Sequence, residues 1–262
     1  DDVTWCHLGD ALTELKEYGE AIDAYREALA RKPGEPAILI NMARPLYLRG
    51  AAEKAAARLV AALERGGDGR ALLNLASIAP GVPGYDLRRV YEIRRAFGLA
   101  LSEPDASAAD CLQRAAMDNP GPIAELTRPR RRDGPLRVAY LSAHFGQLAY
   151  MGPVWALINH HDRDRFKLFL LSDAPVEGPF PGFEGHASDT VVDVAGANDA
   201  ALEGLIAEQR IDLLIDLSAY SYPSRLSLFK KRVAPVTAAW FNMYATSGLP
   251  GIDYIIGDEY VV

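Results

Sequence analysis

The spacing of hydrophobic residues changes once along the chain. Up to about residue 117, apolar residues recur every three or four positions, which is typical of amphipathic helices. After residue 135, short apolar runs alternate with helical stretches, which is typical of buried strands joined by helices. Between the two parts lie prolines, a glycine and a run of arginines, which disfavour regular structure. The pattern therefore predicts a helical part, a linker over 128–135 and an α/β part over 136–262.

The helical part contains an internal repeat. Residues 5–33 follow the tetratricopeptide pattern, in which a Trp-x-x-Leu-Gly helix precedes a second helix with small and aromatic residues. A shift of about 34 residues, the tetratricopeptide period, lands on a second apolar set: Leu39, Met42, Ala43, Leu46, Ala55, Leu59 and Ala62. A further shift loses the pattern at Arg89. We therefore expect tetratricopeptide repeats over 1–69 and a helical capping or spacer segment over 70–127, in which Arg94 is partly buried and paired.

The second part alternates between strands and helices. Strands are expected at 136–141, 166–171, 190–194, 211–217, 236–241 and 254–256. Helices are expected at 153–160, 198–209 and 224–231, the first with Pro153 in its first turn and the second capped by Asn198. Such alternation implies a parallel sheet with helices on both faces. The fold class is therefore α + α/β, a helical repeat followed by a parallel-sheet lobe.

Composition narrows the class of protein. Hydrophobic residues make up 49% and charged residues 24%, a globular balance that excludes a disordered or collagen-like chain. The net charge of −7 argues against a nucleic-acid partner. Apolar runs are far shorter than the roughly 20 residues that span a bilayer, and two cysteines fit a reducing compartment. We therefore expect a cytoplasmic protein with no membrane or nucleic-acid partner. Because no GxGxxG, P-loop, CxxC or HExxH motif is present, we also expect no cofactor and no metal site.

Candidate chemistry gathers in the loops that follow strands. Ligands of parallel α/β sheets bind outside the carboxyl ends of the strands, which singles out the loops 142–147, 218–222 and 242–248. Their hydroxyls, amides and aromatic rings suit a sugar or a nucleoside, which needs neutral hydrogen bonds and a stacking surface. His144 is the strongest candidate for acid–base chemistry because it follows the first strand, although a structural role is equally open. For Asp216, at the end of another strand, turn capping competes with catalysis.

Several runs in the second part form an ordered series. They are Leu-Arg-Val-Ala-Tyr-Leu-Ser-Ala-His-Phe at 136–145, Arg-Ile-Asp-Leu-Leu-Ile-Asp-Leu at 210–217, Arg-Leu-Ser-Leu-Phe at 225–229, Ala-Pro-Val at 234–236, Trp240, Thr-Ser-Gly-Leu-Pro at 246–250 and Asp-Tyr at 253–254. Preceded by tetratricopeptide repeats, this series resembles the bacterial relatives of the nucleocytoplasmic O-GlcNAc transferases. The order and spacing match over roughly residues 136–258.

The resemblance implies a Rossmann-like lobe over 136–262, which is half of a two-lobed GT-B fold. It implies a metal-free glycosyltransferase that moves N-acetylglucosamine from UDP-GlcNAc, or the sugar of another UDP-sugar, to Ser or Thr hydroxyls of proteins. The acceptor protein or peptide would be held in the groove of the tetratricopeptide helices. His144 is then the catalytic candidate. The substrate-binding candidates are Phe145, Gly146, Gln147, Tyr220, Arg225, Asn242, Tyr244 and Thr246.

Several positions depart from the family pattern, among them the stretch 241–245 between Trp240 and Thr246. His144 stands where the family has an acidic residue, and Leu148 stands where the family has a histidine that lies against the donor phosphates. Tyr220 and Arg225 keep family positions and favour an enzyme, whereas Leu148 favours a catalytically decayed tetratricopeptide scaffold for protein–protein interaction. The sequence starts without methionine and stops at Val262 after one lobe. We therefore expect an excised piece that is inactive without a C-terminal donor lobe.

Overall fold

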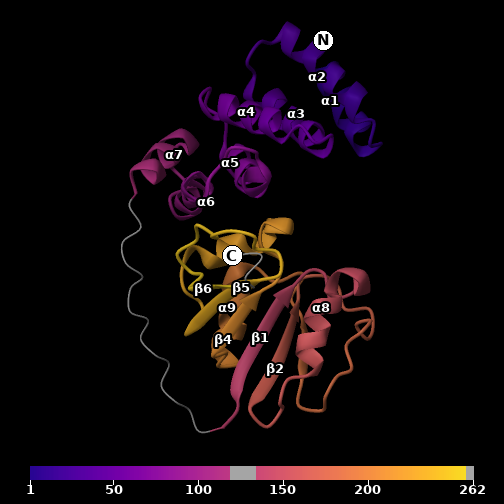
Figure 1. Cartoon of the computed structure of the whole chain (residues 1–262), viewed down its shortest axis with the longest axis vertical. Coiled ribbons are helices and arrows are strands. Elements are labelled where there is room, and N and C mark those ends of the chain that lie inside the picture. The colour runs from indigo at the N-terminus through magenta and orange to yellow at the C-terminus, as the bar shows by residue number, and fades with distance from the viewer. Residues whose placement is uncertain (119–133, 258–262) are drawn as a thin grey trace. The chain divides into compact units, whose positions relative to one another are not determined.

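The computed structural model describes residues 1–118 and 134–257. The chain divides into two compact units, 1–119 and 120–262. Figure 1 shows that the described part of the first unit is helical and that the described part of the second is built around a sheet. All but the last two positions of the predicted linker over 128–135 lie outside the described residues.

The first unit stacks its helices in pairs. The described helices are α1 (Asp2–Glu14), α2 (Tyr18–Arg31), α3 (Pro36–Leu48), α4 (Ala52–Leu63), α5 (Gly69–Ile78), α6 (Leu87–Ser102) and α7 (Ala108–Met117). Short connections at 15–17 and 49–51 join α1 to α2 and α3 to α4, and the two helices of each pair pack together. A third pair, α5 and α6, has a longer connection at 79–86. The longer connection explains why the repeat spacing is lost near Arg89.

The first helical pair depends on a close approach at Gly9. A Cβ atom on Gly9 would lie 2.8 Å from carbon atoms of the Tyr25 ring, so a side chain there would collide with the ring. Tyr25 is 1% exposed, and its hydroxyl donates to Asp10 Oδ1 at 2.6 Å. Burial, followed by this hydrogen bond, raises the pKa of Tyr25, so its hydroxyl stays protonated. The glycine of the repeat is therefore required by the aromatic residue of the next helix.

The segment after the repeats has a buried cation in its core. Arg94 on α6 is 2% exposed, and its Nε donates to the carbonyl of Ala76 at 3.1 Å. Ala76 lies in the last turn of α5, where carbonyl groups have no partner within their own helix. Arg94 is therefore more deeply buried than the partial burial that we expected, and it is hydrogen-bonded to the main chain. Cys111 on α7 is also buried, and burial raises the pKa of its thiol.

The second unit is a parallel sheet. The strands are β1 (Leu136–Ser142), β2 (Phe166–Ser172), β3 (Thr190–Asp193), β4 (Leu213–Asp216), β5 (Val236–Trp240) and β6 (Tyr254–Ile256). Their order is β3-β2-β1-β4-β5-β6, with every neighbouring pair parallel. This is the Rossmann order, in which the chain reverses direction across the sheet between β1 and β4. The predicted strands and the Rossmann-like lobe are confirmed.

The helices of this unit differ from the prediction in two places. The helix α8 (Leu148–Asn159) begins before Pro153 and holds this proline in its interior. It begins early because the Gln147 carbonyl accepts hydrogen bonds from the amides of Tyr150 and Met151. The segment expected as a helix at 224–231 forms the 3₁₀ helix η3 (Pro223–Lys230), which follows a shorter one, η2 (Ala219–Ser221).

The helix α9 (Asp199–Glu208) is capped as predicted. The Asn198 side chain accepts a hydrogen bond from the Ala201 amide at 2.9 Å, which satisfies one of the first free amides of the helix. Figure 1 shows α8 lying along β1 and β2, and its buried residues pack against Tyr140 and Leu168 on one face of these strands. Leu141 and Leu171 point to the opposite face and are buried as well. Both faces of the sheet are therefore covered, as parallel sheets require.

Candidate functional site

Three loops meet at the carboxyl edge of the sheet. The Ala143 amide donates to Ser218 Oγ at 3.1 Å, which joins the loop after β1 to the loop after β4 across the point where the strand order reverses. The side chain of Asn242, after β5, donates to the Leu217 carbonyl. The Tyr220 hydroxyl donates to the Ser247 carbonyl at 2.8 Å. The loops singled out from the sequence thus form one surface at the crevice where α/β sheets bind ligands.

Asp216 shapes the loop after β4. It is 1% exposed, and its two carboxylate oxygens accept hydrogen bonds from the Ser218 and Ala219 amides, both at 3.1 Å. Ala219 has a φ of +44°, a left-handed conformation that is uncommon for residues other than glycine. Burial raises the pKa of Asp216 to about 6, although the two amide hydrogen bonds act against the shift. The geometry agrees with turn capping, the alternative to catalysis at this position.

His144 lies between two tyrosine rings. Its imidazole centre is 4.8 Å from that of Tyr150 and 6.0 Å from that of Tyr222, both in edge-to-face orientation. Both ring nitrogens are buried, and no described residue makes a hydrogen bond to either of them. Burial lowers the pKa of His144, so the imidazole is neutral at neutral pH. A neutral imidazole can accept a proton, which is the property that a general base needs.

Two predicted substrate-binding residues point into the unit. Phe145 is 1% exposed and packs against the rings of Trp155 and Phe180, with centre distances of 5.3 and 5.1 Å. Arg225 is 7% exposed and forms an ion pair with the buried carboxylate of Asp173. Phe145 and Arg225 therefore hold their loops in place from inside the unit.

Of the other candidates, Asn242 and Tyr220 are also buried, and the rest lie nearer the surface. Tyr150 donates its hydroxyl to Asn242 Oδ1, and Asn242 is 4% exposed. Tyr244, on the loop after β5, is 62% exposed, and Thr246 on the same loop is half-buried. Gln147, at the start of α8, is exposed. The outward-facing groups of the edge are thus amide and phenol groups, which form hydrogen bonds without a net charge.

A hollow of about 360 Å³ opens beside the loop after β1. The predicted residues Gly146 and Gln147 line it, together with Ser172 at the end of β2 and the segment 174–181. Sequence reasoning missed 174–181, which carries Glu177 into the lining. Its position directly after a strand was the available signal, since such segments lie at the same carboxyl edge.

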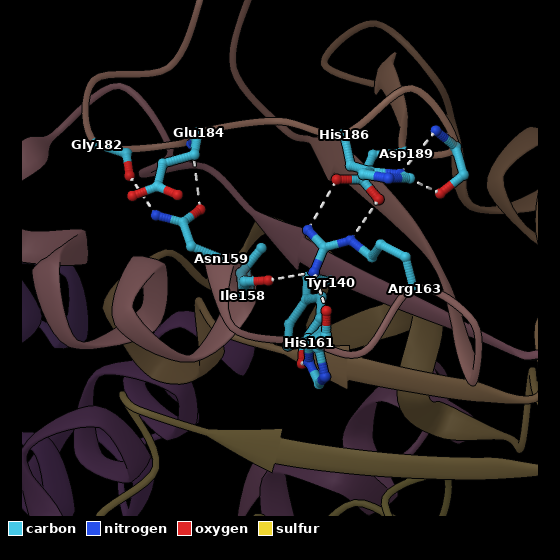
Figure 2. A network of polar contacts seen from close by, with 10 residues as sticks. Tyr140, Ile158, Asn159, His161, Arg163, Gly182, Glu184, His186 and Asp189 are labelled. Atoms are coloured by element: carbon cyan, nitrogen blue, oxygen red, sulfur yellow. Dashed lines mark hydrogen bonds and ion pairs between the residues drawn. The ribbon is translucent and has the colours of Figure 1, made fainter.

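A polar network ties α8 to the end of this segment (Figure 2). Asn159 donates to the Gly182 carbonyl at 2.9 Å and accepts from the Glu184 amide at 3.1 Å. Arg163 contacts both carboxylate oxygens of Asp189, at 3.0 and 2.9 Å. The Arg163–Asp189 pair is largely buried, and it therefore fixes the strand-to-strand connection that lines the hollow.

The same network includes a contact between Tyr140 on β1 and His161 after α8. The Tyr140 hydroxyl lies 2.6 Å from His161 Nε2, and Figure 2 shows the two rings close to the Arg163 guanidinium. Burial and the charge of Arg163 lower the pKa of His161, which keeps Nε2 free to accept the hydrogen bond from Tyr140. The contact anchors the C-terminal end of α8 to β1.

The first unit carries its own concave surface. A hollow of about 370 Å³ is lined by residues of α1, α2, α3 and α5: Asp10, Ala11, Thr13, Glu14, Tyr25, Ile40, Asn41, Arg44 and Asn74. A second hollow of about 240 Å³ continues along α3 and α5 past Tyr47 and Ser77. Amide and charged side chains line the first hollow, and the second hollow is more apolar.

Two observations bear on membranes and metals. No helix in the part of the chain that the structure describes is long and apolar enough to cross a membrane. The described residues contain no group of three His, Cys, Asp or Glu side chains placed to hold a metal ion.

Fold and site together define a class of protein. A helical repeat followed by one Rossmann-type lobe, with its polar loops at the crevice of the sheet, corresponds to the first half of a GT-B glycosyltransferase. The chain belongs to glycosyl transferase family 41, whose family model matches residues 88–262. Residues 3–35 match the tetratricopeptide repeat model, which confirms the repeat.

Solved and curated proteins agree with this assignment. A solved mutant of the Thermobaculum terrenum O-GlcNAc transferase is similar over 99% of this chain, with a TM-score of 0.72 and 26% identity. A UDP-N-acetylglucosamine–peptide N-acetylglucosaminyltransferase of Caenorhabditis elegans is 28% identical over 64% of this chain. The probable transferase SPINDLY of Arabidopsis thaliana is 26% identical over 48% of it. This chain covers 47% of the solved relative and 15% and 14% of the two curated ones.

Proposed function

We propose that this chain supplies the acceptor-side lobe and the acceptor-presenting helices of a UDP-sugar-dependent protein glycosyltransferase. The sugar would be N-acetylglucosamine and the acceptor a Ser or Thr hydroxyl, in keeping with the names of the relatives. The observation that carries the proposal is the neutral imidazole of His144, which lies at the crevice of the sheet and to whose two nitrogens no described residue bonds.

The proposed reaction needs a base and no metal. The acceptor oxygen bonds to the anomeric carbon of the sugar, the bond from that carbon to the phosphate oxygen breaks, and UDP leaves with the electron pair. His144 takes the proton of the acceptor hydroxyl as the new bond forms. Gln147 and Gly146 at the hollow, with Tyr244 and Thr246, would hold the substrates; this assignment extends the sequence prediction. Asn242, a substrate-binding candidate by sequence, is buried and bonded within the lobe, so it acts, like Phe145, Tyr220 and Arg225, through the loops that it holds in place.

The acceptor would be bound by the first unit. The hollows lined by α1, α3 and α5 present Asn74 and Arg44, whose donors suit the carbonyl groups of an extended peptide. Such a groove fixes a polypeptide by its main chain and so accepts many sequences. The expected partner is therefore a protein or peptide substrate.

A binding scaffold is the second candidate function. Leu148, at the first position of α8 beside the hollow, is 53% exposed. An apolar side chain at this place offers no hydrogen bond to a phosphate group. If the site has decayed, the tetratricopeptide groove would bind a polypeptide without modifying it.

The two candidates are separated by an enzyme assay on the full-length protein that contains this chain. Wild type and His144→Ala are incubated with UDP-[³H]GlcNAc and a set of Ser- and Thr-containing proteins, and the label in protein is counted. The proposal predicts transfer by wild type and a loss of about 10²–10⁴-fold in His144→Ala, which is the usual contribution of a general base.

His160→Ala is the matched control, because His160 is an exposed histidine at the end of α8. It should transfer at the wild-type rate. Equal rates in wild type and His144→Ala would remove His144 as the base. No transfer by wild type, with retained binding of proteins to the groove, would favour the scaffold. The 262-residue chain alone is expected not to turn over UDP-GlcNAc, because it corresponds to 47% of the solved relative.

A further inference from the structure

The nitrogens of the His144 imidazole are shielded from solvent, although His144 belongs to a loop. His144 as a whole is half-buried, yet both of its ring nitrogens are buried and none of the described residues bonds to them. A general base must come within about 2.6–3.2 Å of the hydroxyl oxygen whose proton it takes. No acceptor hydroxyl can reach either nitrogen until one of the groups that cover the imidazole moves.

The two rings over His144 differ in how firmly they are held. Tyr150 belongs to α8, and its hydroxyl donates to Asn242 Oδ1. Asn242 is 4% exposed and is itself bonded to the Leu217 carbonyl, so this ring is anchored to the core of the lobe. Tyr222 is 42% exposed and is not part of an α-helix or strand.

Tyr222 sits between two fixed points of the backbone. Before Tyr222, the Ser218 amide donates a hydrogen bond to the Asp216 carboxylate, which holds that turn in place. On the other side η3 is held by Ser227, whose hydroxyl donates to Asp199 at 2.6 Å, and by the Arg225 ion pair. The backbone is therefore fixed while the phenol ring is free to change rotamer. Exposed side chains change rotamer within nanoseconds, far faster than enzymatic turnover.

We infer that Tyr222 is the side-chain cover of His144, which an incoming acceptor chain displaces to bring its hydroxyl to the imidazole. The inference rests on the proposed role of His144 for its catalytic meaning, but the cover itself is a property of this chain. With the cover closed, water is kept from the base, and so His144 cannot activate water to attack the sugar donor. Tyr222 would therefore decide between transfer to the acceptor and hydrolysis of the donor.

The cover is tested on the 262-residue chain by chemical modification. Diethyl pyrocarbonate acylates accessible imidazole nitrogens, and mass spectrometry of a digest gives the rate at each histidine. His160, which is exposed, serves as the internal reference in the same sample. In wild type His144 should react much more slowly than His160. In Tyr222→Ala the rate at His144 should rise about tenfold or more, since reactivity scales with the fraction of molecules in which the imidazole is uncovered.

Two variants control for indirect effects. Tyr222→Phe keeps the ring and should react at His144 as wild type does. Tyr254→Ala removes a tyrosine that is 50% exposed on β6, and it should also leave the rate at His144 unchanged. A constant, slow rate at His161, whose Nε2 lies 2.6 Å from the Tyr140 hydroxyl in the folded lobe, shows that each variant is folded. The inference is overturned if His144 and His160 react equally fast in wild type, or if Tyr222→Ala does not accelerate modification of His144.

The catalytic consequence is measured separately on the full-length protein. Release of UDP from UDP-GlcNAc without acceptor should be faster in Tyr222→Ala than in wild type, while the yield of glycosylated acceptor per UDP released falls. If modification of His144 is accelerated but wild type transfers no sugar, the cover stands and the proposed function fails. If transfer depends on His144 but its modification does not depend on Tyr222, the proposed function stands and the cover fails.

Discussion

The ion pair of Arg225 offers the sharpest test of how the site is built. Arg225 keeps a family position and is a substrate-binding candidate by sequence, yet its guanidinium is fully engaged within the lobe. Its Nε donates to Asp173 Oδ1 at 2.8 Å, and Nη1 and Nη2 donate to the carbonyls of Ala197 and Val194 at 2.6 and 2.7 Å. The perturbation is Arg225→Met, which retains most of the side-chain length and removes every one of these donors.

The expected loss of stability follows from the carboxylate of Asp173, which stays buried after Arg225 is replaced. Asp173 is 6% exposed, so Arg225→Met leaves a buried carboxylate without its cation. Removing one partner of a buried ion pair typically costs about 3–5 kcal/mol. The Ser224 hydroxyl still donates to Asp173 Oδ2 at 2.9 Å, which places the expected loss near the lower end, at about 3 kcal/mol. With a urea dependence of roughly 2 kcal/mol per M, the unfolding midpoint should fall by about 1.5 M.

Tryptophan fluorescence during urea unfolding provides the assay. Trp155 is 2% exposed in the core of the second unit, and Trp5→Phe removes the tryptophan of the first unit from the signal. A double-mutant cycle with Asp173→Asn isolates the pair and should give a coupling energy of about 2 kcal/mol. Arg225→Lys is a partial control, because one ammonium group keeps the charge and cannot replace the planar guanidinium.

The opposite outcome is equally specific. Exposed ion pairs contribute less than about 1 kcal/mol to the free energy of unfolding. A loss that small for Arg225→Met would therefore refute the structural role of Arg225. If the KM for the sugar donor then rose in the full-length protein, Arg225 would be a substrate-binding residue as the sequence suggests.

Two further predictions concern other contacts. Gly9→Ala should destabilise the first unit by about 1–3 kcal/mol in thermal unfolding, because the new Cβ would lie 2.8 Å from the ring of Tyr25. Gly69→Ala, where a Cβ meets nothing within 4 Å, should not destabilise it; equal effects of the two variants would refute the steric argument. His161 has a pKa below its ordinary value of about 6.5, so its hydrogen bond with Tyr140 stabilises the fold above that pH and is lost as the pH falls through the lowered pKa. The stability difference between wild type and His161→Phe should therefore shrink on acidification from pH 7.5 to 5, and a difference independent of pH would contradict this assignment.

Much of the fold was predictable because its signals are local. The strands β1 and β2 are buried on both faces and therefore appear in the sequence as continuous apolar runs. The repeat was visible because each helical pair needs the same small and aromatic residues to pack. The start of α8 was not predictable from Pro153, because the hydrogen bonds that begin the helix come from Gln147, whose position depends on the turn before it.

The sequence predicts where the site lies, but not which of its side chains face outward and which are buried. The loops at the carboxyl ends of the strands follow from parallel topology alone. Which side chains face outward depends on partners far away in sequence: Arg225 turns inward to Asp173, and Phe145 turns inward to Phe180. The segment 174–181 carries no periodic pattern, so only the position of its strand could have marked it.

The edge of the sheet therefore has two layers with different duties. Below the surface, Asp216, Asn242 and Arg225 bond to backbone groups of the loops, and each of them is buried. These bonds satisfy main-chain groups that no helix or strand satisfies, which lets irregular loops keep one conformation. The side chains of Gln147 and Tyr222 instead face outward and are exposed. Substitution in the lower layer should therefore lower the stability of the lobe, whereas substitution in the upper layer should change substrate binding without loss of stability.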